Sequence, residues 1–154
     1  MFHLAVLTIV VTGLIGPGPD RAFTCVGGHR PPTSAPITDP FRPPAQPWLP
    51  GNRGLEYGTE PGDPVTASHQ GTVVFAGAIG RHQYVTIAHG CDLVTTYSFL
   101  GQRLVDAGAP VARGQLVGRA GTTRFHFGAR LDGHYIDPDL LFSHRLERTV
   151  RLVA

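Results

Sequence analysis

From Gly51 to Ile136 the chain consists of short segments rich in β-branched and aromatic residues, separated by turns that contain glycine. Two of the longer segments, Gln83–His89 and Asp92–Phe99, are joined by the two-residue turn Gly90-Cys91. Apolar segments of this length with a glycine turn between them favour antiparallel hairpins over helices. The 20 glycines and 14 prolines also disfavour long helices. The sequence therefore predicts an all-β fold made mostly of antiparallel strands.

The segment Thr123–Arg130 has the clearest alternation of polar and apolar residues in the chain. Because successive side chains of a strand point to opposite faces, one face is polar and the other apolar. The polar face carries Arg124, His126 and Arg130, and the apolar face carries Phe125, Phe127 and Ala129. A strand packed on its aromatic face would present His126 rigidly to a groove. The alternative is a histidine that only decorates a half-exposed strand, and the surrounding residues decide between the two.

The last strand of the predicted sheet lies at Gly133–Asp137. Pro138 follows it and favours a short helical turn that continues through Phe142, because proline is well suited to the first position of a helix. Residues 143–154 form a C-terminal tail without a clear period and are left unassigned.

The N-terminus has the composition of an export signal. The run from Leu4 to Gly16 is almost entirely apolar and is shorter than the roughly 20 residues of a membrane-spanning helix. We expect residues 1–24 to be a signal peptide and the mature protein to be secreted or associated with the cell wall, with no stable membrane span. The only two cysteines, Cys25 and Cys91, either pair in an oxidising compartment or remain thiols, and the sequence does not decide between these states.

Residues 25–47 form a proline-rich linker, which we expect to stay extended and to contribute no core. Trp48, the only tryptophan, is expected to pack against the first sheet and to mark the start of a domain that spans residues 48–142. The net charge is +2 and every basic residue is an arginine, spread along the chain rather than clustered. This distribution does not indicate nucleic-acid binding.

From about Trp48 to Leu141 the chain carries an ordered series of motifs that together resemble one known family. The motifs are Asn52-Arg53-Gly54-Leu55-Glu56, Gly62-Asp63-Pro64-Val65-Thr66-Ala67, Gly71-Thr72-Val73-Val74-Phe75-Ala76-Gly77, Val85-Thr86-Ile87-Ala88-His89-Gly90, Thr95-Thr96-Tyr97, Gly108-Ala109-Pro110-Val111-Ala112-Arg113-Gly114-Gln115-Leu116-Val117-Gly118, Phe125-His126-Phe127-Gly128-Ala129-Arg130 and Asp137-Pro138. In this order they resemble the lysostaphin/LytM-type zinc endopeptidases, which cut peptidoglycan cross-links. The resemblance implies a sheet or sandwich of that type.

The resemblance also assigns roles, and most of the positions have lost the residue that the role requires. In the family a histidine and an aspartate of a His-x-Gly-x-Asp pattern bind zinc together with the second histidine of a His-x-His strand. Those three positions fall on Asn52, Glu56 and His126. Two further catalytic histidines fall on Phe99 and Arg124. Only His126 is intact and Glu56 is conservative, so zinc binding at Glu56 and His126 is doubtful and we expect no cofactor.

These substitutions predict a degenerate site in a domain that has lost catalysis. Such a domain would act at the cell wall by binding peptidoglycan or by regulating a cell-wall hydrolase. Arg53, Arg124 and Phe99 would line the groove, where guanidinium groups could bind peptide carboxylates. The same residues could equally fill a cleft without a function. The competing hypothesis is an active zinc endopeptidase that uses Glu56, His126 and a further ligand such as His82, His89 or His134.

Overall fold

The computed structural model describes residues 27–142. The predicted signal peptide at 1–24, Cys25 and the predicted tail at 143–154 lie outside the described residues. In the described part, no helix has both the length and the apolar character needed to cross a membrane.

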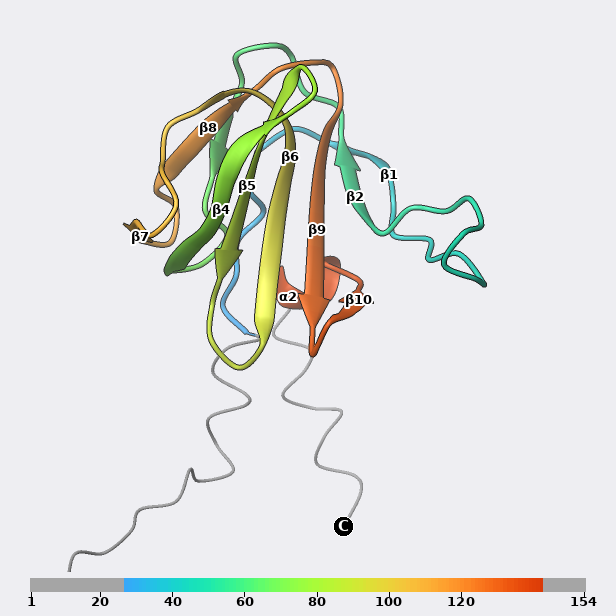
Figure 1. The fold of residues 1–154 in the computed structure, drawn as a ribbon. Coiled ribbons are helices and arrows are strands. Elements are labelled where there is room, and N and C mark those ends of the chain that lie inside the picture. Colours follow the sequence, from blue (N-terminus) through green and yellow to red (C-terminus); the bar gives the residue numbers. More distant parts are fainter. Residues whose placement is uncertain (1–26, 143–154) are drawn as a thin grey trace, which may run out of the picture.

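Antiparallel strands make up almost all of the regular structure, as the sequence predicts (Figure 1). The strands are β1 (Ile37–Asp39), β2 (Gly54–Tyr57), β3 (Pro64–Thr66), β4 (Gly71–Ile79), β5 (His82–Ala88), β6 (Leu93–Arg103), β7 (Pro110–Val111), β8 (Leu116–Ala120), β9 (Phe125–Leu131) and β10 (His134–Ile136). Seven of them form the path β1-β2-β9-β6-β5-β4-β7, while β10 pairs with β9 and β8 joins β3 to β6. A short helix, α2 (Asp139–Phe142), follows β10, so the helical turn after Pro138 is confirmed.

Strand β9 lies inside the sheet between β2 and β6 (Figure 1). The predicted alternation is confirmed, because Phe125 and Phe127 are fully buried while His126 is half-buried on the opposite face. The two phenylalanine rings pack against Tyr97 of β6, whose side chain is also fully buried. The aromatic face thus fixes the strand on the core and leaves the His126 face open.

Strand β6 changes its partner at Phe99. Up to Ser98 it pairs with β9, and from Leu100 it pairs with β8. Phe99 has a φ of 65°, a left-handed conformation that is uncommon for a large side chain. The bend at this residue carries the strand from one part of the sheet to the other and turns the Phe99 ring toward the cleft.

The hairpin between β5 and β6 is confirmed, but its connection is longer than the predicted two residues. Residues 89–92 lie outside both strands, and Cys91 and Asp92 both have positive φ values. The loop is closed by hydrogen bonds between His89 and Leu93 and between Leu93 and Gly90. Cys91 is disulfide-bonded, which excludes the alternative in which it remains a thiol.

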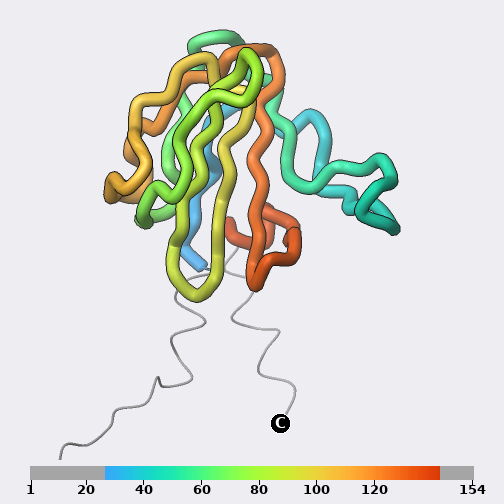
Figure 2. The backbone as a smooth tube through the Cα atoms, viewed as in Figure 1, coloured from blue at the N-terminus to red at the C-terminus, as the bar shows by residue number. Residues whose placement is uncertain are grey.

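The expectation that the proline-rich segment contributes no core is wrong for the part that the structure describes. Ile37–Asp39 pairs with β2, His29 is buried, and Phe41 packs against the main core. Strand β1 was missed because its pairing depends on a distant partner rather than on local composition. The expected packing of Trp48 is also wrong: its side chain is 78% exposed, on the β1–β2 loop that projects from the body of the protein (Figure 2).

Candidate functional site

The cleft is built on the polar face of β9 by its two neighbouring strands. Across β2, Glu56 is the register partner of His126, and across β6, Ser98 is the register partner of the same residue. Residues opposite one another in antiparallel strands have side chains on one face and close together. The structure therefore brings Glu56 and His126 together, as the sequence predicts.

Gly54 provides the space that the His126 ring occupies. A Cβ atom at this position would lie 2.8 Å from His126 Nε2 and 2.3 Å from the carbonyl oxygen of Phe127. Both separations are far below van der Waals contact, and the second involves backbone that cannot move away easily. The glycine of the Asn-Arg-Gly-Leu-Glu segment is thus required by the packing of β2 on β9, whatever the site does.

Asn52, at the position of the first family zinc ligand, uses its side chain to hold the base of the β1–β2 loop. It is only 5% exposed, and its Nδ2 donates hydrogen bonds of 3.1 Å to the carbonyl oxygens of Asp39 and Pro40. Its Oδ1 accepts a hydrogen bond from the backbone N–H of Gly54 at 3.2 Å. The amide is therefore engaged in structure rather than presented to a ligand.

Arg124 and Phe99 occupy the end of the cleft next to His126. The Arg124 Nε lies 3.7 Å from Glu56 Oε2, and its guanidinium lies over the Phe99 ring, 5.4 Å from the centroid. The Phe99 ring is also in edge contact with His82, Tyr84 and His126. A permanent cation and an aromatic ring thus stand where the resemblance places two catalytic histidines.

The surroundings of His126 shift its protonation equilibrium. Burial lowers the pKa of His126, the Glu56 carboxylate opposes this effect, and Arg124 lowers the pKa further. The ring is therefore neutral near pH 7 and could donate or accept a hydrogen bond.

The donors in the cleft do not fit a tetrahedral zinc site. Such a site needs three protein ligands besides water, and here the third position is an amide already bonded to backbone. Within residues 27–142 no three His, Cys, Asp or Glu side chains are grouped so that they could hold a metal ion. The proposed substitute His89 has both ring nitrogens engaged, by the Gln70 carbonyl at 2.8 Å and the Thr95 hydroxyl at 2.7 Å.

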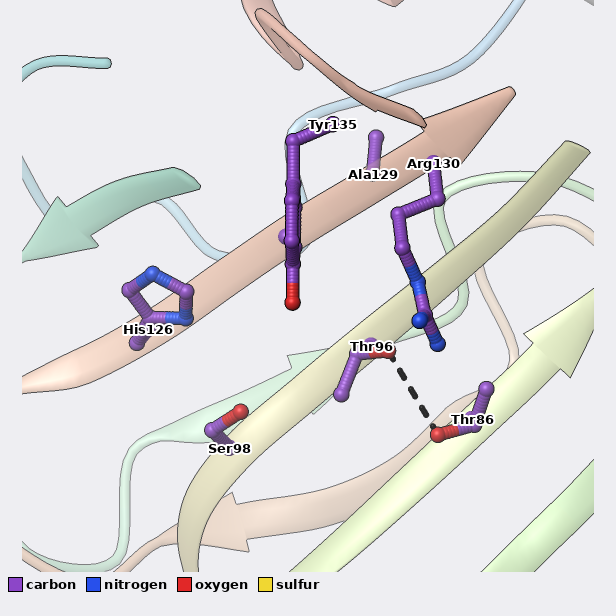
Figure 3. Close-up of a pocket in the computed structure, with 8 residues that line it drawn as sticks. Thr86, Thr96, Ser98, His126, Ala129, Arg130 and Tyr135 are labelled. Carbon is purple, nitrogen blue, oxygen red and sulfur yellow. Dashed lines mark hydrogen bonds between the residues drawn. The ribbon is translucent and has the colours of Figure 1, made fainter. Parts of the chain in front are cut away.

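Beyond His126 the same face of the sheet opens into a cavity of about 220 Å³ (Figure 3). Its floor is Gly128, which has no side chain and lies between His126 and Arg130 on β9. The walls carry hydroxyl groups and one arginine. The lining residues are Thr86, Thr96, Ser98, His126, Gly128, Ala129, Arg130 and Tyr135.

Sequence reasoning missed the hydroxyl groups of this cavity and Tyr135. Thr86 and Thr96 are register partners in the β5–β6 hairpin, and Tyr135 is the register partner of Arg130. The alternation of β6 could have placed Thr96 and Ser98 on the His126 face. Tyr135 could be placed only once the register of β10 was known.

Two arginines lie over the Tyr135 ring. The Arg53 guanidinium is 5.9 Å from the ring centroid and the Arg130 guanidinium is 5.6 Å from it. The Arg53 guanidinium also donates a hydrogen bond to the Pro47 carbonyl in the projecting loop. Of the predicted groove residues, Arg124 and Phe99 therefore lie at one end of the cleft and Arg53 at the other.

A second group of histidines lies on the core side of the sheet, away from the cleft. The His29 and His69 rings stack at 4.8 Å, and the His89 ring meets His29 edge-on at 4.9 Å. His69 is therefore half-buried by its contact with His29. A chain of hydrogen bonds runs from His29 through the Ser68, Tyr97 and Thr95 hydroxyls to His89.

Comparison with known proteins agrees with this architecture. The profile described as peptidase family M23 matches residues 50–138. A metalloprotease of Haemophilus influenzae is 29% identical over 114 residues, which cover 66% of this chain and 24% of the relative. The murein hydrolase activator NlpD of Salmonella typhimurium is 30% identical over 95 residues, which cover 57% of this chain and 25% of the relative. The chain thus spans about a quarter of the length of these relatives.

Among solved structures, lysostaphin has the same fold. The two superpose with a TM-score of 0.60 at 21% identity, covering 70% of this chain and 49% of lysostaphin. The predicted fold type is confirmed by this likeness.

Proposed function

The chain belongs to peptidase family M23, and we propose that it is a non-catalytic member, exported to the cell wall, that binds peptidoglycan or regulates a cell-wall hydrolase. One observation carries the proposal: the Arg124 guanidinium is paired with Glu56, the carboxylate that a metal ion would need. A permanent positive charge beside the two remaining donors disfavours a divalent cation.

The other replaced positions support the loss of catalysis. Phe99 has no group that can transfer a proton, and the Asn52 amide is held by three hydrogen bonds in the loop base. General acid or base groups contribute about 10²–10⁴-fold to rate each, so the loss of both helper histidines would leave little activity even with metal present. His126 and Glu56 then remain as parts of the cleft wall.

A regulatory role is supported by the relative from Salmonella, which is named for the activation of murein hydrolases. A cell-wall location is supported by the same relative and by the predicted signal peptide. In both roles the cleft is the binding surface. Its ligand is a peptidoglycan peptide in the first role and a protein in the second.

The competing function is an active zinc endopeptidase, which is supported by the adjacency of Glu56 and His126 and by the metalloprotease relative from Haemophilus. It requires a third ligand from outside the described residues or a rearrangement of the cleft. The two functions differ in metal content and in cleavage.

The test is to purify the chain, dialyse it against zinc, and measure bound metal together with cleavage of cross-linked muropeptides. In parallel, the chain is sedimented with insoluble peptidoglycan and added to purified cell-wall hydrolases. We expect substoichiometric zinc, no cleavage, and either co-sedimentation or a change in hydrolase rate. About one zinc per chain with cleavage that a chelator abolishes would establish the competing function. Absence of both co-sedimentation and hydrolase regulation would overturn the binding role.

A further inference from the structure

We propose that the cavity beside His126 binds the carboxylate of a short peptide, with Arg130 as its charged partner. The inference rests on the proposed function, because it names the chemical group that this cleft recognises. It concerns the end of the cleft that lies away from the Arg124–Glu56 pair, where His126 is the one family position of the zinc site among the lining residues.

Arg130 is the arginine of the cleft whose charge is not already used. The Arg124 guanidinium pairs with Glu56, and the Arg53 guanidinium donates to the Pro47 carbonyl. Within the described residues, Arg130 makes no side-chain hydrogen bond or ion pair and only stacks on Tyr135. Stacking fixes the plane of the guanidinium and leaves its N–H groups directed at the cavity, where they can form two parallel bonds to a carboxylate.

The rest of the lining consists of groups that can donate hydrogen bonds to an anion. Figure 3 shows the Arg130 side chain extending toward Thr96 and Thr86, with the Tyr135 hydroxyl facing the same space. The Thr86 and Thr96 hydroxyls are 3.5 Å apart, a weak mutual bond that either could exchange for a ligand oxygen. None of the lining residues is Asp or Glu, so no negative charge competes for Arg130.

The size of the cavity favours the end of a peptide over an extended ligand. Its volume of about 220 Å³ is below the roughly 300–1,000 Å³ of sites for drug-sized molecules. The space exists because Gly128 lacks a side chain. A Cβ atom there would meet its nearest neighbours, His126 Cε1 and the Arg53 carbonyl oxygen, at 3.6 and 3.8 Å, which is ordinary contact. A larger residue at position 128 would therefore fill the cavity from its floor.

The test measures binding by calorimetry to three probes: N-acetyl-Ala-Ala with a free C-terminal carboxylate, its C-terminal amide, and N-acetyl-glutamate amide, whose carboxylate is on the side chain. Both alanine peptides are used in L and D forms. We expect at least one of the two acids to bind about tenfold or more tightly than the amide, because a charged hydrogen-bonded pair is lost in the amide. Whichever acid binds identifies the source of the carboxylate.

The variant Arg130→Gln should weaken the binding of the acid about tenfold or more and leave the amide unaffected. Arg119→Gln is the matched control, because Arg119 is an exposed arginine on β8 that donates to the Gly62 carbonyl outside the cavity. Gly128→Val should abolish binding by filling the floor. Thermal melting of each variant verifies that it is folded.

Equal binding of acid and amide, unchanged binding in Arg130→Gln, or no binding of either acid by the folded parent would overturn the carboxylate inference. Co-sedimentation with peptidoglycan and hydrolase regulation are measured on the same Arg130→Gln and parent proteins. If the parent retains either property while no probe binds, the carboxylate inference fails and the proposed function stands. If the parent binds the acid but has neither property and cleaves muropeptides with bound zinc, the proposed function fails and the carboxylate site remains.

Discussion

Two histidines with lowered pKa values lie on opposite faces of the same sheet, and their surroundings differ. His89, on the core side, has both ring nitrogens bonded, to the Gln70 carbonyl and the Thr95 hydroxyl. His126, in the cleft, makes no hydrogen bond through its ring nitrogens to another described residue. Its ring meets Phe99 edge-on and packs over Gly54, and the charges of Glu56 and Arg124 act on its pKa. The first histidine is hydrogen-bonded into the core, while the second forms part of the cleft wall.

The comparison separates the contacts that hold the fold from the residues that line the cleft. The contacts that hold β9 in place come from its aromatic face and from Gly54, and none of them depends on a metal. Replacing residues on the cleft face therefore changes the chemical groups that line the cleft and lowers the stability of the sheet only slightly. We therefore expect the core side of the sheet to carry the stability and the cleft side to carry only the chemistry.

The largest effect is expected from restoring the four changed positions together, with Asn52→His, Glu56→Asp, Phe99→His and Arg124→His. Together with His126 this variant has the full set of three ligands and loses the competing cation, so we expect its zinc affinity to exceed that of the parent by about a thousandfold or more. The measurement is competition for zinc with a chromophoric chelator. A variant that folds but binds zinc no better than the parent would show that these four residues are not what excludes the metal.

Asn52→His also removes three hydrogen bonds from the base of the β1–β2 loop. The matched control is therefore Asn52→Ala, which loses the same bonds without gaining a ligand. It should be destabilised to a similar extent and should not gain affinity for zinc.

The next largest effect is expected in the free energy of unfolding, which His89→Ala should lower more than His126→Ala does. His89→Ala removes two hydrogen bonds and leaves the buried Thr95 hydroxyl without one partner, so we expect the free energy of unfolding to fall by about 1–3 kcal/mol. His126→Ala removes no side-chain hydrogen bond to another described residue and should cost less than about 1 kcal/mol. Urea unfolding of both variants measures the difference. Equal losses would contradict the division between a structural core side and a dispensable cleft side.

The strand pattern was predictable where the signal is local. The alternation of β9, the β5–β6 hairpin and the helical turn after Pro138 all follow from neighbouring residues. Each of these depends on side-chain periodicity or turn chemistry, which a single sequence displays directly. The adjacency of Glu56 and His126 was implied by the family resemblance, which places both residues in one site.

The features that the sequence did not reveal depend on distant contacts. Strand β1 is stabilised by β2, the bend at Phe99 arises where β6 exchanges β9 for β8, and His69 is covered by His29. Trp48 stays exposed because the loop that carries it is closed at its base by Asn52 and does not fold back onto the sheet. Local sequence patterns do not show which distant segments pair with one another.

The pH dependence of stability should follow from the same two histidines. Burial lowers the pKa of both His89 and His126 below the ordinary value of 6.5, so the unfolded chain binds protons more readily than the folded one. Stability from these groups is complete above pH 6.5 and declines as the pH falls through 6.5 toward the lower folded-state pKa values. Urea unfolding at a series of pH values measures the slope.

His89→Gln removes one of these titrations while keeping an amide that can form hydrogen bonds. We expect it to flatten the decline in stability on the acid side of pH 6.5. His134→Gln is the control, because His134 is exposed on β10. A slope that stays unchanged in His89→Gln, or that flattens equally in the control, would contradict the assignment to His89.

The smallest effect is expected at the Arg124–Glu56 pair, where the Arg124 side chain is 61% exposed and the charged atoms are 3.7 Å apart. Exposed pairs of this kind contribute about 0–1 kcal/mol, so Arg124→Gln should change the free energy of unfolding by no more than that. The same variant should raise the pKa of His126, because Arg124 is one of the two causes that lower it. An NMR titration of the His126 ring measures the pKa, with Arg119→Gln as the control that should leave it unchanged. A large loss of stability without a change in this pKa would mean that Arg124 holds the fold together rather than setting the charge of the cleft, and the two faces of the sheet would then be less independent than their contacts indicate.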